Sequence, residues 1–314
     1  MNSSEKLRLL QTLKIWARLA RIPFLTATIV PVALGTIVAW TLLGNLNLGY
    51  FVMTLVGALC LHLGTNIIND YFDFRSGCDA INTDGLSPIS GGSRVLLEGL
   101  IKPQRAYFVA LSFFGVASII GIILSIAVGW GVFLLGIVGI VSGYFYVSQL
   151  STRGIGELIV GLNFGPLMVL GSYYVQTQRF DSGPLVASVP IGLLITAILW
   201  INEVPDYAAD KAVGKKTLVV RVGRKRAAEL YALIVIAAYV WTALMAVLKQ
   251  LPFGSLLVLI TLPIAAKAII VAMKYHEKPR IMVAANLSTI KIHLLFGVLL
   301  TASYVAGLFW SYPY

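Results

Sequence analysis

Apolar runs of roughly 20 residues recur along the whole sequence, and they constrain the possible fold more than any other feature. An uncharged run of this length can cross the hydrocarbon core of a bilayer as a single helix. Hydrophobic residues make up 58% of the chain and charged residues 12%, which is about half the charge of an average soluble domain. The sequence therefore predicts an all-α, polytopic membrane protein.

Nine apolar segments are candidates for membrane-spanning helices, and we expect residues 1–314 to form a single domain. The expected spans are residues 22–43, 48–68, 106–128, 130–147, 158–174, 185–201, 227–248, 253–273 and 292–310. Pro31 and Pro205 predict a kink or distortion, because proline cannot donate a helical hydrogen bond. Residues 1–21 are polar and basic, which indicates a cytoplasmic segment or interfacial helix rather than a cleavable signal peptide.

Positive charges are distributed unevenly between the two sides of this predicted topology. With the N-terminus in the cytoplasm, nearly all of the 24 Lys and Arg residues fall on the cytoplasmic side. The exceptions are Arg179 and Lys249 on the opposite side and Lys267 inside a span. The bias predicts a multi-pass protein of the inner (plasma) membrane whose net charge of +11 faces anionic lipid headgroups, so no nucleic-acid partner is expected.

Acidic residues gather in two polar stretches, each of which follows an apolar run. More than half of the 13 acidic residues lie in or beside them: Asp70, Asp73, Asp79, Asp84, Glu203, Asp206 and Asp210. Under the predicted topology both stretches lie at the cytoplasmic face. Acids near the ends of apolar helices are costly unless they are used, so the clustering favours a functional site over a solvated loop.

The spacing within each stretch predicts a stripe of oxygen ligands. Side chains four positions apart lie on one face of a helix. The first stripe comprises Asn66, Asp70 and Asp73, and the second comprises Asn202, Asp206 and Asp210. Asp and Asn oxygens suit hard divalent cations, Mg²⁺ above all, which usually bridges to substrate phosphates.

Basic and aromatic side chains extend this prediction to a substrate. Arg75, Lys215 and Lys216 can neutralise a diphosphate held by the metal. A substrate with a diphosphate head at the cytoplasmic face and an apolar tail among the helices is a polyprenyl diphosphate. Aromatic faces can stabilise an allylic cation, although packing is the simpler explanation for each candidate. The candidates are Tyr71, Phe72, Tyr144, Tyr146, Tyr173 and Tyr174.

Three other polar features each have two interpretations. The segment Ser90-Gly-Gly-Ser93 either offers backbone N–H groups to an anion or forms a plain loop. Glu157 either orients an acceptor or stabilises the start of a helix. His62 is either a partner of the first stripe or a hydrogen-bonded interior residue.

The two acidic stretches resemble the motifs of the UbiA superfamily of intramembrane aromatic prenyltransferases. The resemblance rests on Asn66-x-x-x-Asp70-x-x-Asp73, on Asn202-x-x-x-Asp206-x-x-x-Asp210 and on the nine expected spans, so it covers nearly the whole chain. It implies that both motifs bind Mg²⁺ and a prenyl diphosphate, and that the product is a C-prenylated aromatic ring.

Further details of the resemblance concern single positions. Arg21 is similar to an arginine at the start of the first span that can face the diphosphate. Many members have Asp at the last position of the first motif, where this chain has Gly77, with Asp79 two residues later. The segments 69–79, 154–176 and 214–223 resemble the branch that prenylates 1,4-dihydroxy-2-naphthoate in menaquinone synthesis, with loss of the acceptor carboxylate.

We therefore expect a Mg²⁺-dependent prenyltransferase that joins a polyprenyl group to 1,4-dihydroxy-2-naphthoate at the cytoplasmic face. Asp70, Asp73, Asp206 and Asp210 are the expected catalytic residues. The alternative acceptors are 4-hydroxybenzoate, homogentisate, a lipid and a tetrapyrrole. A membrane transporter is the alternative of another class, although acidic clusters at one face rather than at the midplane favour an enzyme.

Overall fold

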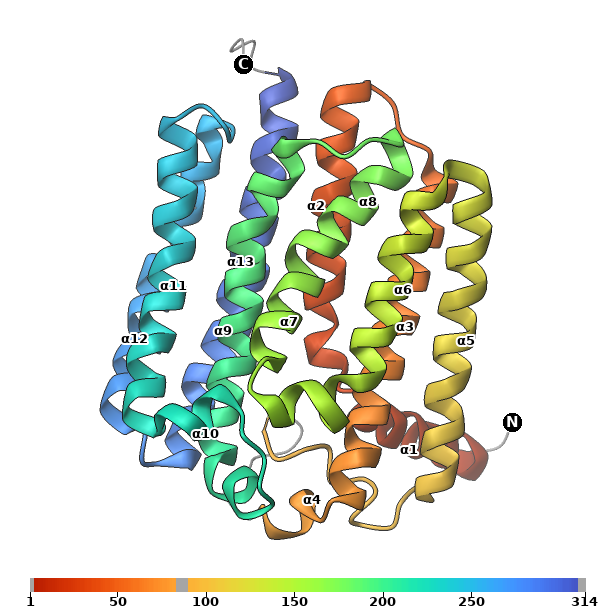
Figure 1. Ribbon diagram of the computed structural model, residues 1–314, viewed down its shortest axis with the longest axis vertical. Coiled ribbons are helices and arrows are strands. Elements are labelled where there is room, and N and C mark those ends of the chain that lie inside the picture. Colours follow the sequence, from red (N-terminus) through yellow and green to blue (C-terminus); the bar gives the residue numbers. More distant parts are fainter. Residues whose placement is uncertain (1–2, 83–89, 310–314) are drawn as a thin grey trace.

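The structure is a computed structural model, and it describes residues 3–82 and 90–309. Within these residues every regular element is a helix, and the long helices stand side by side along one axis (Figure 1). The long elements are α2 (Thr26–Leu43), α3 (Leu48–Arg75), α5 (Pro103–Val128), α6 (Trp130–Phe145), α9 (Ser182–Ala212), α11 (Arg224–Val247), α12 (Leu262–Tyr275) and α13 (Pro279–Phe309).

Eight helical segments of the described chain are long and apolar enough to cross a membrane, which confirms the predicted all-α, polytopic class. The remaining expected span, residues 130–147, corresponds to α6. Its 16 residues extend only about 24 Å, less than the thickness of a bilayer core of about 30 Å. Helix α1 (Ser3–Leu19) lies at the lower end of the bundle and α13 ends at the upper end, as an odd number of crossings requires (Figure 1).

Two of the spans are composite. One is built from α7 (Gly156–Leu162), the π-helical turn η4 (Asn163–Leu167) and α8 (Met168–Thr177). The other begins as the 3₁₀ helix η5 (Phe253–Thr261) and continues as α12. The remaining short elements are η1 (Ile22–Leu25), α4 (Cys78–Ile81), the π-helical turn η2 (Tyr146–Leu150), η3 (Ser151–Arg153) and α10 (Leu218–Val222).

Pro205 does not interrupt its helix, contrary to the distortion that we expected there. Helix α9 continues through Pro190 and Pro205, and α2 likewise continues through Pro31. The interruption occurs instead at Pro166, inside η4, where a wider turn accommodates a residue that cannot donate a backbone hydrogen bond. The polar residues of α9 therefore keep a regular helical spacing, and the broken helix that would suit a transporter is absent at Pro205.

The last span begins well before residue 292, the start that its apolar pattern indicates. Helix α13 begins at Pro279, and its first turns carry the buried polar residues Asn286 and Thr289. A search for continuous apolar runs overlooks such a segment, because polar side chains interrupt the run while the helix continues. These early turns of α13 lie beside the candidate site.

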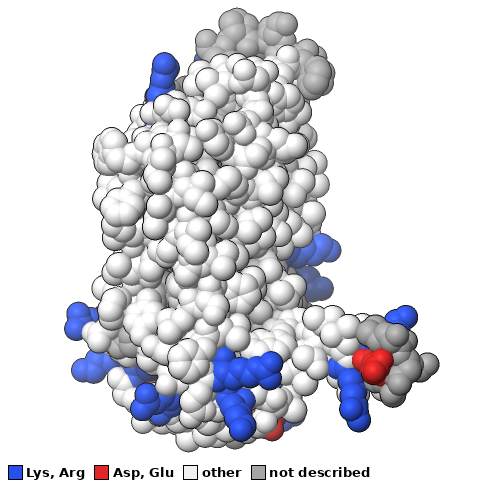
Figure 2. All heavy atoms as spheres, turned by 90° about the vertical axis from the view of Figure 1, so that its right-hand side faces the viewer, with Lys and Arg blue, Asp and Glu red and all other residues white. Residues whose placement is uncertain are grey.

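Helix α9 is the central helix of the bundle. It packs against α7, α11 and α13, and 72% of its most apolar 18-residue segment is buried. Trp200 of α9 donates its indole N–H to the carbonyl oxygen of Ala227 in α11, at 2.8 Å. Lys and Arg side chains gather at the lower end of the face shown in Figure 2, while the middle of that face is largely free of charge. The polar ends of α3 and α9 meet at this lower end (Figure 1).

Candidate functional site

A polar cavity of about 90 Å³ lies between the ends of α3 and α9. Helix α3 contributes Asn69 and Asp73, and α4 contributes Asp79. Helix α9 contributes Asn202, Glu203, Asp206 and Asp210. Arg21, Asn82 and Lys215 also line the cavity, as do Ser90, Gly91 and Gly92. Both acidic stretches thus meet at one site; Asp84 lies outside the described residues.

The side chains of the first stretch that face the cavity are Asn69 and Asp73, and not Asn66 and Asp70. Asn66 is turned toward the N-terminal segment and donates to the carbonyl oxygen of Ala20, at 2.9 Å. Asp70 is 1% exposed; it forms an ion pair with Arg21 and accepts the backbone N–H of Ser93 at 3.0 Å. Asn66 and Asp70 therefore do not line the cavity, because the helical stripe that reaches it begins at residue 69, and their metal roles stay predictions.

Gly77 explains how the chain supplies a second acid to this side of the cavity. Helix α3 ends at Arg75, and Gly77 adopts a positive φ of 77° that reverses the chain into α4. Helix α4 then carries Asp79, which is 4% exposed, into the cavity. Burial, together with the neighbouring charges of Asp73 and Asp70, raises the pKa of Asp79 to about 7. Asp79 thus reaches the cavity although α3 ends before residue 77.

The second stretch keeps the predicted register. Asn202, Asp206 and Asp210 all line the cavity from one side of α9. Asp206 accepts hydrogen bonds from the side-chain amide of Asn82 at 2.9 Å and from the backbone N–H of Gly91 at 3.1 Å. The glycine-rich loop therefore gives its N–H groups to the carboxylates of both stretches, through Ser93 to Asp70 and through Gly91 to Asp206.

Four cationic side chains were predicted to bind the diphosphate, and two of them, Arg21 and Lys215, line the cavity. The Lys215 ammonium lies 2.6 Å from Asp73 and 3.3 Å from Asp210, so it links α3 to α9. Burial alone would lower the pKa of Lys215, but Asp73 and Asp210 raise it well above its usual value. Arg21 lines the cavity beside its ion pair with Asp70.

The other two predicted diphosphate ligands point elsewhere. Arg75 is exposed, and its guanidinium lies 3.4 Å from the hydroxyl of Tyr71. Lys216 is also exposed, and its carbonyl oxygen accepts a hydrogen bond from Arg221. Neither Arg75 nor Lys216 lines the cavity, because helix α3 and the 211–217 loop turn these side chains outward. Their predicted contact with the diphosphate is therefore not supported by the geometry.

Asn286 was missed at the level of sequence, and the contacts of Glu203 and Glu157, which the sequence did indicate, were not predicted. Asn286 of α13 is fully buried and donates its side-chain amide to Oδ1 of Asn202, at 2.9 Å. Glu203 lines the cavity, and its Oε2 is buried with no hydrogen-bond partner among the described residues. Glu157 accepts the backbone N–H of Leu218 at 2.6 Å, so it anchors the loop that carries Lys215. No spacing rule could have joined α13 to α9.

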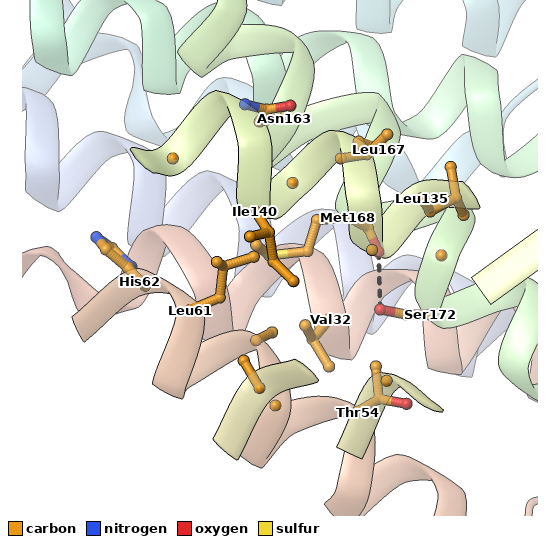
Figure 3. A pocket seen from close by; sticks show the side chains of 18 of the residues that line it. Val32, Thr54, Leu61, His62, Leu135, Ile140, Asn163, Leu167, Met168 and Ser172 are labelled. Carbon is orange, nitrogen blue, oxygen red and sulfur yellow. Dashed lines mark hydrogen bonds between the residues drawn. The ribbon is translucent and has the colours of Figure 1, made fainter. Parts of the chain in front are cut away.

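A second, apolar cavity of about 180 Å³ lies between α2, α3, α5, α6, α8 and η4. Leu61, Ile140, Leu167 and Met168 project into it in Figure 3. Tyr146 lines both this apolar cavity and the polar cavity, so the two spaces adjoin at its side chain.

His62 lies in the wall of the apolar cavity and has the interior role that we considered for it (Figure 3). Its Nδ1 lies 2.7 Å from the hydroxyl of Thr28, and its ring packs edge-on against Phe164. The first stripe is not among its hydrogen-bond partners. The polar wall of the apolar cavity also includes Asn163, whose amide donates to the hydroxyl of Ser142 at 2.6 Å.

The donor set of the polar cavity fits a hard divalent cation. Asp73, Asp79, Asp206 and Asp210 supply carboxylate oxygens, which Mg²⁺ prefers. Oδ1 of Asn69 is buried and has no hydrogen-bond partner among the described residues, so it is available to a ligand. Within residues 3–82 and 90–309, no three Asp, Glu, His or Cys side chains lie close enough together to hold a metal ion as they stand. Lys215 contacts Asp73, and Asn82 and Gly91 donate to Asp206.

Comparison with known proteins agrees with this architecture. The sequence profile of the UbiA prenyltransferase family matches residues 28–295. The chain is 30% identical to a 1,4-dihydroxy-2-naphthoate octaprenyltransferase of Bacillus subtilis, over 94% of this chain and 93% of the relative. It is also 30% identical to a 2-carboxy-1,4-naphthoquinone phytyltransferase of Synechocystis, over 93% of this chain and 94% of the relative.

The fold is also similar to a solved structure, that of a UbiA homolog from Archaeoglobus fulgidus bound to GPP and Mg²⁺. The TM-score is 0.58 at 15% sequence identity, and the match covers 92% of this chain and 99% of the solved chain.

Proposed function

The chain belongs to the UbiA prenyltransferase family, and from this premise we propose that it transfers a polyprenyl group from its diphosphate to 1,4-dihydroxy-2-naphthoate. The observation that carries the proposal is the junction of the two cavities at Tyr146. A polyprenyl diphosphate has one strongly anionic end and one apolar end. The polar cavity matches the first in its cations and metal-ligand oxygens, and the apolar cavity matches the second.

We assign the metal-binding role to six residues that line the polar cavity. Asn69, Asp73 and Asp79 hold one side of the site, and Asn202, Asp206 and Asp210 hold the other. Bound Mg²⁺ would stabilise the negative charge on the departing diphosphate as the allylic C–O bond breaks. Asn66 and Asp70 keep a supporting role: Asn66 fixes the chain at Ala20, and Asp70 holds Arg21 in place.

Arg21 and Lys215 bind the diphosphate in this proposal. Both are cationic side chains at the cavity wall, and both lie beside carboxylates that hold them there. Lys215 pairs with Asp73 and Asp210, so a bound metal would compete with Lys215 for these two carboxylates, and a diphosphate would compete with the carboxylates for Lys215. When the diphosphate binds, the Lys215 ammonium is expected to exchange a carboxylate for a phosphate oxygen.

Tyr146 is in place to act at the reacting carbon. Its ring stands where the polar and apolar cavities meet, which is where the allylic carbon next to the diphosphate would lie. An aromatic face stabilises a nearby cation. Burial and the neighbouring charges of Glu203 and Glu157 raise the pKa of the Tyr146 hydroxyl, so the phenol stays neutral at physiological pH. Tyr71, Tyr144 and Tyr173 do not line either cavity.

The naphthoate acceptor is proposed from the relatives. The two curated relatives named above share about the same identity over nearly the whole chain, and both names specify a carboxylated naphthalene ring. Transfer to such a ring replaces the carboxyl group, which leaves as CO₂, by the prenyl group. We further propose that residues 1–314 act as one domain in the plasma membrane, with the site at the cytoplasmic face, in accord with the basic lower end in Figure 2.

A turnover assay on the purified full chain in lipid tests this proposal. Each reaction contains geranylgeranyl diphosphate, Mg²⁺ and one acceptor: 1,4-dihydroxy-2-naphthoate, 4-hydroxybenzoate or homogentisate. We expect prenylated product and CO₂ release only with the naphthoate, and no diphosphate release after chelation of Mg²⁺. Product with another acceptor alone would overturn the substrate assignment, and turnover in chelator would overturn the metal assignment.

A further inference from the structure

Helix α1 presents an apolar surface that the spans do not cover. Leu9, Leu10 and Leu13 are 47%, 47% and 55% exposed. Spacings of three and four residues place them on one side of a helix. On another side, Leu19 is fully buried and Ile15 packs with it against the α3–α5 core, so α1 is held to the bundle while its leucines face outward.

The same helix is basic. Lys6, Arg8 and Lys14 are all exposed, and the helix contains a single acidic residue, Glu5. Figure 1 shows α1 lying across the lower end of the bundle rather than along the spans. Figure 2 shows that Lys and Arg gather at this end. At about 100° per residue, Lys6 lies among these leucines and Lys14 lies beside them, while Arg8 lies toward the opposite side. A helix at the membrane-water boundary that combines exposed leucines with such a positive charge can bind an anionic bilayer surface.

The C-terminal end of α1 is bonded to the loop that closes the polar cavity. Arg18 donates to the carbonyl oxygen of Ser93 at 2.7 Å and forms a two-pronged ion pair with Glu98, at 2.9 and 2.5 Å. The backbone N–H of Ser93 in turn binds Asp70, and that of Gly91 binds Asp206. Arg18 therefore connects α1 to the 90–99 loop, whose backbone N–H groups bind the carboxylates of both acidic stretches.

We propose that α1 is a surface arm that binds anionic phospholipid and, through Arg18, holds the 90–99 loop closed over the polar cavity. The occupant of the leucine side is the bilayer in which the chain itself sits, because the spans keep α1 at the level of the headgroups. Basic side chains then contact the anionic headgroups while the leucines enter the outer part of the acyl region. The proposal goes beyond the prenyltransferase assignment, and its main test needs no turnover.

The first test is hydrogen–deuterium exchange on the full chain in nanodiscs of phosphatidylcholine alone or with added phosphatidylglycerol. We expect exchange in residues 3–19 to slow by about tenfold in the anionic discs, because the negative surface attracts the basic side chains of α1. The effect should weaken in high salt, which screens exposed charges. Exchange in α9 should not change, which reports that the bundle stays folded.

Charge variants test whether the lipid response depends on the basic residues of α1 or on the positive charge of the whole lower end. The triple variant Lys6→Gln, Arg8→Gln and Lys14→Gln should lose the slowing in anionic discs. Its matched control removes three exposed positive charges between the last turn of α12 and the first turn of α13, with Lys274→Gln, Lys278→Gln and Arg280→Gln. This control should keep the slowing in residues 3–19. Equal loss in both variants would overturn a specific role for α1.

Arg18→Gln tests the link to the loop. Arg18 is paired with Glu98, so its loss should leave the lipid response of residues 3–14 intact. In the native chain we expect anionic discs to slow exchange in residues 90–99 as well, and this response should disappear in Arg18→Gln. The KM for geranylgeranyl diphosphate should rise by about threefold to tenfold in anionic discs. An unchanged loop response in Arg18→Gln would overturn the link. Identical exchange of residues 3–19 in neutral and anionic discs would overturn the lipid assignment and favour a protein partner for the leucines.

Discussion

The two acidic stretches of the polar cavity have similar residue types but very different supports. On α9, Asn202, Asp206 and Asp210 belong to one unbroken helix that is packed on several sides. On the other side, α3 supplies only Asn69 and Asp73 before it ends, and Asp79 arrives from the separate short helix α4. The comparison shows two ways to place three ligand side chains at a metal site. One is a regular spacing along a single helix, and the other is a reversal of the chain at a glycine that brings in a residue from a second helix.

The largest loss of activity is expected at Asp73 and Asp206, because the comparison predicts that these two carboxylates have equivalent roles in their stretches. Asp73→Ala and Asp206→Ala should each reduce kcat by at least about 10²–10³-fold, the scale seen when one preorganised charge-stabilising group is removed. Both carboxylates line the cavity at the corresponding place in their stretch. A steady-state assay checks this, with size-exclusion profiles as a control for folding. Near-normal turnover in either folded variant would contradict the pairing of the two stretches.

Asp79→Asn addresses the difference between the stretches and should cost about 10–10²-fold in turnover at limiting Mg²⁺. Because the pKa of Asp79 is raised to about 7, a proton competes with the metal below that pH. The apparent Mg²⁺ affinity of the native chain should therefore fall as the pH drops through 7, and this fall should be smaller in Asp79→Asn. Titration of Mg²⁺ at pH 6 and pH 8 measures both effects.

The double variant Asp79→Ala with Gly77→Asp sharpens the same point. Gly77 has a positive φ and lies after the end of α3, so an Asp there cannot continue the helical stripe. We expect no recovery of activity over Asp79→Ala alone. Recovery to near the native rate would mean that α3 can extend to residue 77, and it would remove the distinction drawn between the two stretches.

Asn286→Ala tests support from outside the stretches and should weaken turnover by about threefold to thirtyfold, since it removes one hydrogen bond of about 1 kcal/mol and leaves Asn202 free to turn. If Asn286 acts through Asn202, its effect should vanish when Asn202 is already Ala. Thr289→Val is the matched control on α13, because Thr289 bonds Tyr231 and not a cavity residue. Additive losses in the double variant would contradict positioning through Asn202.

The smallest effects are expected at the two cations that face away from the cavity. Arg75→Gln and Lys216→Gln should each change the KM for the prenyl diphosphate by less than about threefold, because both side chains are exposed and an exposed ion pair is worth only about 0–1 kcal/mol. Lys215→Gln serves as the positive control and should raise the same constant strongly. A tenfold rise of this KM in Arg75→Gln would indicate that Arg75 contacts the diphosphate after all.

Much of the candidate site could be predicted because its chemistry depends on residue type. Asp73, Asp206, Asp210, Asn202, Arg21 and Lys215 were all expected at the site, and all line the cavity. The errors have a common cause. On α3, residues 66 and 70 are four apart, and so are 69 and 73, so spacing alone gives two stripes on neighbouring faces. Packing against Ala20, Arg21 and Ser93 selects the second stripe for the cavity.

The sequence by itself determined the class of this protein. Long uncharged runs can satisfy their backbone groups in lipid only as helices, and clustered Asp and Asn residues beside cations indicate a metal and a diphosphate. Only the tertiary structure decided which helix faces meet, that Asp79 of α4 lines the cavity, and that Asn286 reaches Asn202 from α13. The reason is physical: residue type and spacing specify chemistry and local geometry, whereas contacts between distant helices depend on how the whole bundle packs.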